Sequence, residues 1–278
     1  MRTLSKLLAG LCCLLLLSGC RSHISSKDSK LTAVFPKIGS ADAALLITDT
    51  ATVLIDTGEE NDSDEILELL EEYGRSTIDL MLISHYDKDH VGGAAAIMDA
   101  CAVKRVIGST SPKDSPEMES YQAALKASKL TEEIPTAPLT ISLGKLYLVV
   151  YPPQQASYSQ DQSNNSSTVI SISYGSTNFL FTGDAMAART AELAPGLAEN
   201  TYDLIKIPHH GRDVDTASQL LPAIKSGGAA VITSSKKEPE NPELLTYLER
   251  SGLHVYLTRN GALTVTSDGT SLKISQED

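Results

Sequence analysis

The residues best suited to chemistry in this chain gather in segment 84–93, which reads SHYDKDHVGG. Four side chains in it can bind a metal ion: His85, Asp87, Asp89 and His90. The apolar stretch 78–84 runs directly into them and predicts a buried strand. His85 and Asp87 are two positions apart, so an extended backbone points both side chains the same way. So many ligand types within six residues predict a metal site rather than a solvated loop.

Two later segments repeat the pattern of an apolar strand that ends in a possible metal ligand. Residues 179–184 read FLFTGD and end in Asp184, and residues 204–211 read LIKIPHHG and contain His209 and His210. Each segment alone is weak, because strand-Gly-Asp turns are frequent and adjacent histidines also occur in cores and loops. Four of the six histidines of the chain lie in the first and third segments. We therefore expect the three strand ends to meet at one site.

The elements that must position these residues alternate along the chain. Apolar runs predict strands at residues 43–47, 52–55, 78–84, 103–107, 141–151, 168–174, 178–181, 203–207, 229–233, 255–257 and 263–265. Helices are predicted at residues 64–73, 91–100, 121–129, 217–224 and 242–251. This order favours an α/β fold with two packed sheets and helices outside them, a four-layer αββα sandwich. Residues 111–138, rich in Pro, Ser and charge, are a candidate cover over the site.

The beginning of the chain predicts a targeting segment. Arg2 and Lys6 form a basic start, and residues 7–17 are an apolar run too short to span a bilayer. Residues 17–20 read LSGC and look like a bacterial lipobox, although an ordinary secretory signal beside a cysteine is the alternative. We expect lipid on Cys20, which would make the protein extracytoplasmic and lipid-anchored to the bacterial cell membrane.

This interpretation divides the chain into three parts. Residues 1–19 are the predicted lipoprotein signal peptide, residues 20–30 are the lipidated cysteine and a polar tether, and residues 31–278 are the functional domain. The mature chain keeps Cys101 as a free thiol, so no disulfide framework is possible within it. We expect Cys101 to be a buried apolar residue rather than a nucleophile.

Charge limits the partners of the protein. The chain carries 23 basic and 35 acidic residues, a net charge of −12, and loss of Arg2 and Lys6 with the signal would bring it near −14. That sign opposes tight, non-specific binding of nucleic acid, which needs clustered Lys and Arg. It also disfavours an anionic membrane surface as a partner beyond the anchor.

Taken together, the motifs resemble the metallo-β-lactamase superfamily. They follow in the order Asp56-Thr57-Gly58, the 85–90 cluster, Thr182-Gly183-Asp184 and His209-His210-Gly211. The resemblance is strongest to the branch with the extracellular hydrolase domain of the DNA-uptake competence protein ComEC. In that branch an aspartate replaces the second histidine of the usual HxHxDH string, as Asp87 does here, and an Asn-x-x-Ser precedes a strand, as at 164–167. The similarity covers roughly residues 31–276.

The resemblance implies two divalent metal ions. The ligands that it implies are His85, Asp87, Asp89, His90, Asp184, His209 and His210, with Asp184 bridging the ions and Asp56 a structural support beneath them. Which of His209 and His210 binds metal stays open, and its neighbour would face the substrate. Asn164 and Asn165 stand where other members place a further histidine. Because Asp87 makes its site harder and more negative, we expect manganese or zinc.

The implied reaction is hydrolysis of a phosphoester, more specifically a diester, with two metals activating a water. Asp89, His210 and Lys206 are the candidate catalytic residues, and Asp89 is placed to accept a proton from that water. Asn164, Asn165 and Arg212 are the candidate substrate-binding residues. Arg212 replaces the serine of the usual His-His-Gly-Ser and could grip a phosphate or merely sit on the rim in water. Asn241 likewise replaces a usual histidine.

Three functions remain open. The first is an extracytoplasmic phosphodiesterase or nuclease, with DNA as one candidate substrate and with Lys88, Lys206 and Arg212 supplying a local basic groove. The second is the same metal chemistry on a cell-wall phosphodiester, a thioester or a lactone. The third is a metal-stabilised surface binding module without activity. No protein partner is indicated by the sequence.

Overall fold

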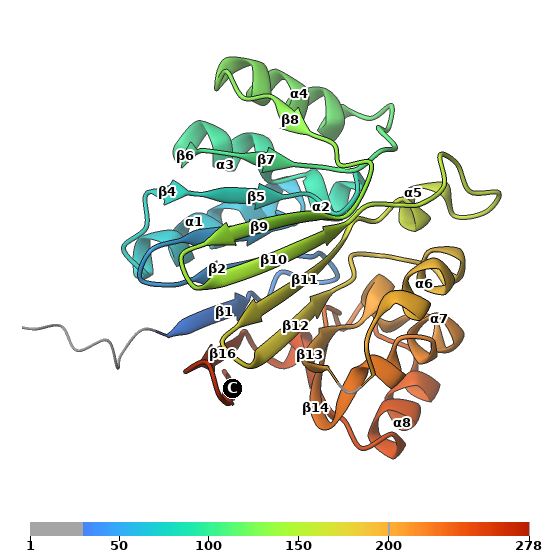
Figure 1. The fold of residues 1–278 in the computed structure, drawn as a ribbon. Helices are drawn as coiled ribbons and strands as arrows, with labels where there is room; N and C mark the ends of the chain where they lie inside the picture. Colours follow the sequence, from blue (N-terminus) through green and yellow to red (C-terminus); the bar gives the residue numbers. More distant parts are fainter. Residues whose placement is uncertain (1–29, 200, 278) are drawn as a thin grey trace, which may run out of the picture.

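Two β-sheets pack face to face in this computed structural model, and helices cover both outer faces (Figure 1). The structure describes residues 30–199 and 201–277. The predicted signal peptide and Cys20 lie outside the described residues. Within those ranges, no helix is long and apolar enough to cross a membrane.

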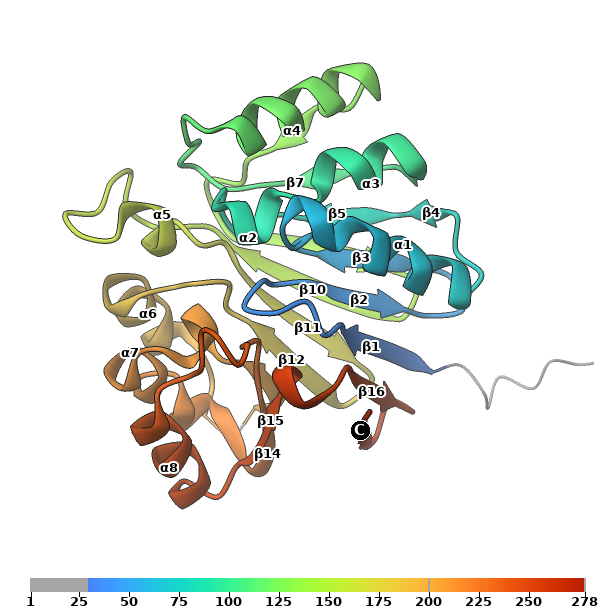
Figure 2. The same cartoon turned by 180° about the vertical axis from the view of Figure 1, so that it is seen from behind.

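The first sheet has eight strands in the order β17-β16-β1-β2-β3-β5-β7-β8. Their bounds are β1 (Leu31–Phe35), β2 (Ala44–Ile47), β3 (Thr52–Ile55), β5 (Leu80–Leu82), β7 (Val106–Ile107), β8 (Glu132–Glu133), β16 (Leu263–Ser267) and β17 (Leu272–Gln276). Its outer face carries α1 (Ser63–Glu72), α2 (Lys88–Val91), α3 (Ala94–Ala100) and α4 (Pro116–Ala127), the first three seen in front in Figure 2. A small sheet pairs β4 (Thr77–Ile78) with β6 (Ala102–Val103).

The second sheet has seven strands in the order β15-β14-β13-β12-β11-β10-β9. Their bounds are β9 (Leu139–Leu143), β10 (Leu146–Tyr151), β11 (Val169–Tyr174), β12 (Thr177–Phe181), β13 (Tyr202–Lys206), β14 (Ile224–Ile232) and β15 (His254–Leu257). The helices on this side are α5 (Gln162–Asn165), α6 (Ala187–Leu193), α7 (Val214–Ser218) and α8 (Pro242–Arg250). Short 3₁₀ turns complete the chain: η1 (Glu60–Asp62), η2 (Ala194–Gly196), η3 (Pro208–Gly211), η4 (Leu221–Ala223) and η5 (Thr258–Asn260).

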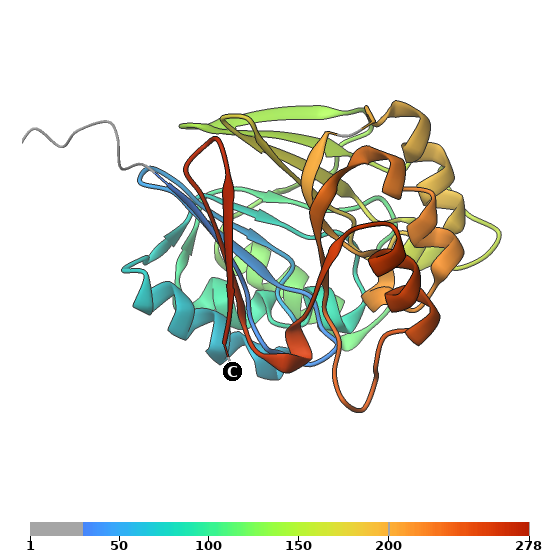
Figure 3. The ribbon, with the colours of Figure 1, turned by 90° about the horizontal axis from the view of Figure 1, so that it is seen from below.

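The core divides into three layers, as expected when both faces of each sheet are covered. Side chains alternate along each strand, so Leu46 of β2 packs between the sheets while Leu45 and Ile47 pack under the helices of the first sheet. A third cluster lies between the second sheet and α6, α7 and α8. Figure 3, viewed from below, shows the cyan helices and the orange helices on opposite sides of the two sheets. The predicted four-layer α/β sandwich is therefore confirmed.

Several predicted elements differ in detail. The single strand predicted at 141–151 is a hairpin of β9 and β10, because Gly144 takes a left-handed turn with φ of 59° in the middle of the apolar run. The helix predicted at 217–224 ends earlier, and Ile224 already belongs to β14. Strands β1 and β17 and helix α6 were not predicted: β17 alternates but has only two apolar side chains, and α6 lacks a clear apolar stripe. Cys101 is half-buried at the end of α3 rather than fully buried.

The sheets bring the motif strands to one edge. β12 and β13 run parallel, as do β3 and β5, so the carboxyl ends within each pair point the same way. Close packing completes the arrangement on the side of the first sheet. A Cβ on Gly93 would lie 2.2 Å from the carbonyl oxygen of Thr57, so only glycine lets the start of α3 approach the 56–58 turn.

We predict that Gly93→Ala lowers the free energy of unfolding by about 1–3 kcal/mol, because the backbone must shift to relieve the overlap. Urea unfolding followed by circular dichroism measures it. Gly196→Ala is the matched control, because a Cβ there meets nothing within 4 Å. A loss for Gly93→Ala no larger than that of the control would contradict the packing argument.

Candidate metal centre

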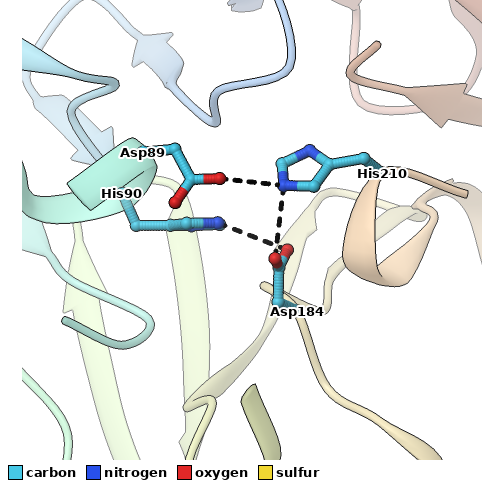
Figure 4. A group of neighbouring side chains, drawn as sticks. All are labelled: Asp89, His90, Asp184 and His210. Carbon is cyan, nitrogen blue, oxygen red and sulfur yellow. Dashed lines mark ion pairs between the residues drawn. The ribbon is translucent and has the colours of Figure 1, made fainter. Parts of the chain in front are cut away.

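Four potential ligands from three chain segments converge at this edge of the sandwich: Asp89, His90, Asp184 and His210 (Figure 4). Their ligand atoms all lie within 4.8 Å of one another, and we call them the four-ligand position. Nε2 of His90 is 3.3 Å from Oδ1 of Asp184, and Nε2 of His210 is 3.2 Å from Oδ2 of the same carboxylate. The carboxylate of Asp184 thus lies between two imidazoles.

A second set of contacts orients these imidazoles. Nδ1 of His90 lies 2.9 Å from Oδ2 of Asp56, while Nδ1 of His210 lies 3.1 Å from the carbonyl oxygen of Thr233. These contacts hold a proton on each Nδ1 and turn each Nε2 toward Asp184, so Nε2 is the nitrogen that would bind a metal after losing its proton. Asp56 also accepts hydrogen bonds from the amide and hydroxyl of Ser84, at 2.7 Å each. The structure thus places Asp56 beneath the site, where the resemblance had assigned a supporting residue.

The turn after β13 separates the two adjacent histidines. His209 and His210 both have left-handed backbone angles, with φ of 47° and 53°, and Gly211 follows with φ of 72°. Two consecutive non-glycine residues in this region are strained, a feature that clusters at functional sites. The turn sends the imidazole of His210 into the four-ligand position, whereas His209 borders the cavity above it. The geometry makes His210 the ligand candidate of the pair, a choice that the sequence left open.

A buried ion pair between Asp42 and Lys206 lies behind Asp184. The sequence analysis singled out Lys206 but not Asp42. Asp42, in the loop before β2, pairs with the ammonium of Lys206, which also donates to the carbonyl oxygen of Gly183 at 3.1 Å. Thr233 donates its hydroxyl to the same Asp42. The only sequence signal for Asp42 is a charge between alanines before an apolar strand. Lys206, expected among the catalytic residues and in a basic groove, is 3% exposed and supports Asp184 from below.

The second implied metal position is less complete. Nε2 of His85 lies 3.8 Å from Oδ2 of Asp87, and we call this pair the two-ligand position. The other carboxylate oxygen of Asp87 accepts from Lys113, at 2.7 Å, and from the hydroxyl of Ser163. Among the described residues, no third His, Cys, Asp or Glu donor lies within 4.8 Å of both members. The two positions therefore differ in their supply of ligands.

Burial and the charges around the centre shift the pKa values of its histidines. Burial lowers the pKa of His210, but the carboxylates of Asp184 and Asp89 outweigh burial and raise it to about 9. Burial also lowers the pKa of His90, but the carboxylates of Asp184 and Asp56 outweigh burial and raise this pKa well above its ordinary value. Burial, together with the neighbouring charge of His90, lowers the pKa of His85 to about 4. Burial also lowers the pKa of His209, which leaves it neutral at pH 7.

The centre opens into a cavity of about 680 Å³. Asn164 and Arg212 both border it, and Nδ2 of Asn164 lies 3.4 Å from Nε2 of His209. Asn165, expected beside the substrate, is instead buried, because its side chain accepts from the amide of Arg189 and donates to the carbonyl of Gln160. It therefore fastens the 160–165 segment to α6 rather than facing the cavity.

Other residues singled out by the sequence have ordinary structural partners. Asn241 is the N-cap of α8 and accepts from the amide of Glu243 at 2.8 Å, so its place in the tail is explained by helix capping. Of the candidate cover at 111–138, the part that borders the cavity is the loop at Lys113. Helix α4 packs instead against the outer face of the first sheet.

Comparison with known families decides the classification. A family model described as the metallo-beta-lactamase superfamily matches residues 37–260, which include every residue of the centre. The chain belongs to the metallo-β-lactamase superfamily. Members of this superfamily are generally metal-dependent hydrolases that bind divalent ions.

Two curated relatives point to one branch of the superfamily. The chain is 25% identical to ComE operon protein 3 of Bacillus subtilis over 197 residues, which is 68% of this chain and 25% of that protein. It is 27% identical to Recombination protein 2 of Haemophilus influenzae over 223 residues, which is 79% of this chain and 26% of that protein. The chain thus spans about a quarter of the length of these relatives. The predicted resemblance to the ComEC branch is confirmed.

Solved structures agree on the fold. The metallo-beta-lactamase fold protein YhfI from Bacillus subtilis matches with a TM-score of 0.52 at 12% identity, covering 89% of this chain and all of that one. The CmlA beta-hydroxylase E377D mutant matches with a TM-score of 0.53 at 15% identity, covering 86% of this chain and 54% of that one. At such identities the likeness concerns the fold alone.

The residues present fit a divalent metal. Nε2 of His85, His90 and His210, and Oδ1 of Asp184, are buried without a hydrogen-bond partner. Once the imidazoles give up their Nε2 protons, these buried polar atoms have no hydrogen-bond donor, and a divalent ion among them would satisfy them together. Imidazole nitrogen and carboxylate oxygen are the donors that zinc and manganese accept.

We predict that His210→Ala lowers metal affinity at least about a hundredfold, because it removes a direct ligand candidate. His209→Ala is the matched neighbour and should keep its metal while losing turnover. Metal content by elemental mass spectrometry and steady-state kinetics separate the two effects. Loss of metal from His209→Ala with retention in His210→Ala would reverse our assignment.

We also predict that metal binding releases protons at pH 7. With raised pKa values, His90 and His210 are protonated in the metal-free protein, and their Nε2 atoms must lose protons to become ligands. Affinity should therefore rise as the pH increases through about 9, the pKa of His210. Calorimetric titration in buffers of different ionisation enthalpy measures the released protons. A binding heat that does not depend on the buffer would contradict the expected protonation.

Proposed function

We propose that this chain is a metal-dependent phosphodiesterase that uses manganese or zinc. The observation that carries the proposal is the four-ligand position: Asp89 and Asp184 line the cavity, and the buried Nε2 atoms of His90 and His210 lie next to them. When bound there, divalent ions supply Lewis acidity and bring the pKa of water toward neutrality.

The side chains around that position have complementary roles in the proposal. Asp89 is 24% exposed and borders the cavity, so it can accept a hydrogen bond from the attacking water. Burial raises the pKa of Asp89, but His210 and His90 outweigh burial and keep the carboxylate ionised at neutral pH. His209 and Asn164 border the same space and can hold the substrate by neutral hydrogen bonds.

Arg212 is the rim cation best suited to a phosphate oxygen, because guanidinium donates in a fixed fork. Its ion pair with Glu238, at 2.6 Å, is 40% and 61% exposed on the two sides and therefore weak. An anionic substrate can compete for Arg212 at little cost. This contact favours a phosphoester over an uncharged thioester or lactone.

The charge of the cavity favours a single diester over a long polyanion. Among the described residues that line it, four are basic and six acidic: Lys88, Lys113, Arg212 and Lys237, against Glu59, Asp62, Asp87, Asp89, Asp184 and Glu238. Lys88 is paired with Glu59 at 2.9 Å, so it adds little to a basic groove. Tight DNA binding depends on clustered free cations that neutralise many phosphates. We therefore place a small phosphodiester, such as one of the cell wall, ahead of DNA.

DNA is the second candidate, and the similarity to ComE operon protein 3 and Recombination protein 2 favours it. The name of the second relative links that protein to recombination. The match covers only about a quarter of each relative. A surface that binds nucleic acid elsewhere in those proteins would therefore lie outside the region that this chain shares with them.

The predicted location follows from the N-terminal pattern alone. We propose that lipid on Cys20 holds the domain outside the cytoplasmic membrane, beside the cell wall. Metabolic labelling with a palmitate analogue tests it, with Cys20→Ser as the control that should lose the label. A label that survives Cys20→Ser would contradict the anchor.

We predict that the manganese- or zinc-loaded protein hydrolyses bis-p-nitrophenyl phosphate, and cleaves single- or double-stranded DNA far more slowly. Asp89→Asn should lower kcat at least about a hundredfold, because it removes an ionised acceptor. Efficient cleavage of DNA would favour the second candidate. Turnover of a thioester or lactone panel without phosphodiesterase activity would contradict the phosphoester. Full metal occupancy with no turnover of any ester would indicate a binding module.

A further inference from the structure

The two metal positions are unequal in a way that involves one lysine. The four-ligand position offers donors from Asp89, His90, Asp184 and His210, whereas the two-ligand position offers His85 and Asp87. In the second case a cation is already present, because the ammonium of Lys113 lies 2.7 Å from Oδ1 of Asp87. The hydroxyl of Ser163 donates to the same oxygen. One of the two carboxylate oxygens of Asp87 is thus fully engaged.

The position of Lys113 is built into the fold rather than left to a free loop. Ser109, four residues before it, donates its amide to the hydroxyl of Tyr86 at 3.0 Å, and that hydroxyl donates back to the carbonyl of Ser109 at 2.9 Å. Tyr86 lies next to Asp87 in the chain and is buried. The loop that carries Lys113 is therefore fastened to the segment that carries its partner.

The other side of the loop is also fastened. The hydroxyl of Ser109 donates to the carbonyl of Ser166, and the side chain of Gln162 donates to the hydroxyl of Ser111 at 3.0 Å. Segment 162–166 also contains Ser163, the second partner of Asp87. Two independent anchors thus hold both donors, Lys113 and Ser163, against one carboxylate.

We propose that Lys113 controls occupancy of the two-ligand position, so that the first divalent ion binds at the four-ligand position and the second binds only when the ammonium leaves Asp87. The inference rests on the metal dependence of the proposed function. A metal ligated by Asp87 and an ammonium on the same carboxylate repel each other, and the pocket around Asp87 screens this repulsion less than water does. Lys113 thereby lowers the affinity of the second ion without contacting the first.

The test is a titration of the purified metal-free protein with Mn²⁺ alone. Calorimetry gives the affinities, and electron paramagnetic resonance counts the free ion. The wild-type protein should show one tight and one weak step. Lys113→Met should tighten the weak step about ten- to a hundredfold, the range over which partners of metal ligands alter affinity, and should leave the tight step unchanged. Because Lys113 is 45% exposed, thermal unfolding should be unchanged as well.

Two control variants test whether the effect comes from the positive charge on Asp87 rather than from the loss of any surface lysine. Lys113→Arg keeps a cation on Asp87 and should keep the weak step. Lys104→Met removes an equivalent lysine, whose ammonium lies 2.8 Å from Asp79 outside the cavity, and should alter neither step. A weak step that stays at wild-type affinity in Lys113→Met would overturn the proposal. Two equally tight steps in the wild-type protein would overturn it as well.

The outcomes also distinguish this inference from the proposed function. A weak step that tightens in Lys113→Met, in a protein that hydrolyses no phosphodiester, would support control by Lys113 and contradict the phosphodiesterase. Phosphodiesterase activity with unchanged metal steps in Lys113→Met would do the opposite. A wild-type protein that binds no Mn²⁺ would overturn the inference about Lys113, and one that binds neither Mn²⁺ nor Zn²⁺ would contradict the proposed function as well.

Discussion

The structure depends on the compensation of negative charge at one edge of the sandwich. Asp42, Asp56 and Asp184 are almost fully buried around His90, each with an oxygen within 4.8 Å of a nitrogen of that ring, and Asp89 borders them. Buried carboxylates are tolerated only where positive charge and hydrogen bonds offset their desolvation. Lys206 supplies one such charge permanently, because the carboxylates of Asp42 and Asp184 outweigh burial and raise the pKa of its ammonium.

The remaining charge comes from groups that can exchange a proton for a metal. The imidazoles of His90 and His210 have raised pKa values for the same electrostatic reason. Three residues behind the ligands hold the centre in place before any ion binds: Asp56 and Thr233 orient the rings, and Lys206 holds the turn that carries Asp184. The three segments that carry the ligands each follow a buried strand, which fixes their positions. The same surroundings hold the strained turn at His209 and His210 in place.

Much of this could be predicted from the sequence, and the reason is local. Where an apolar strand runs directly into its ligands, as at His85, Asp184 and the His209–His210 pair, the order of residue types suffices to locate them. The choice between His209 and His210 could not be predicted, because it depends on consecutive left-handed angles that the sequence does not encode in any simple pattern. Asp42 and Lys113 were missed because their partners are far away in sequence, and only the completed sheets bring them together. Asn165 and Lys206 were expected in the cavity because sequence proximity to a ligand says nothing about the direction of a side chain.

The central claim is that three strand ends enclose a divalent ion. Anomalous diffraction from a crystal grown with Mn²⁺ tests it most directly, because the signal locates the ion without reference to activity. We expect a strong anomalous peak within coordination distance of Asp89, His90, Asp184 and His210 together. A crystal in which those four side chains keep their arrangement while the ion lies elsewhere would contradict the proposed metal centre.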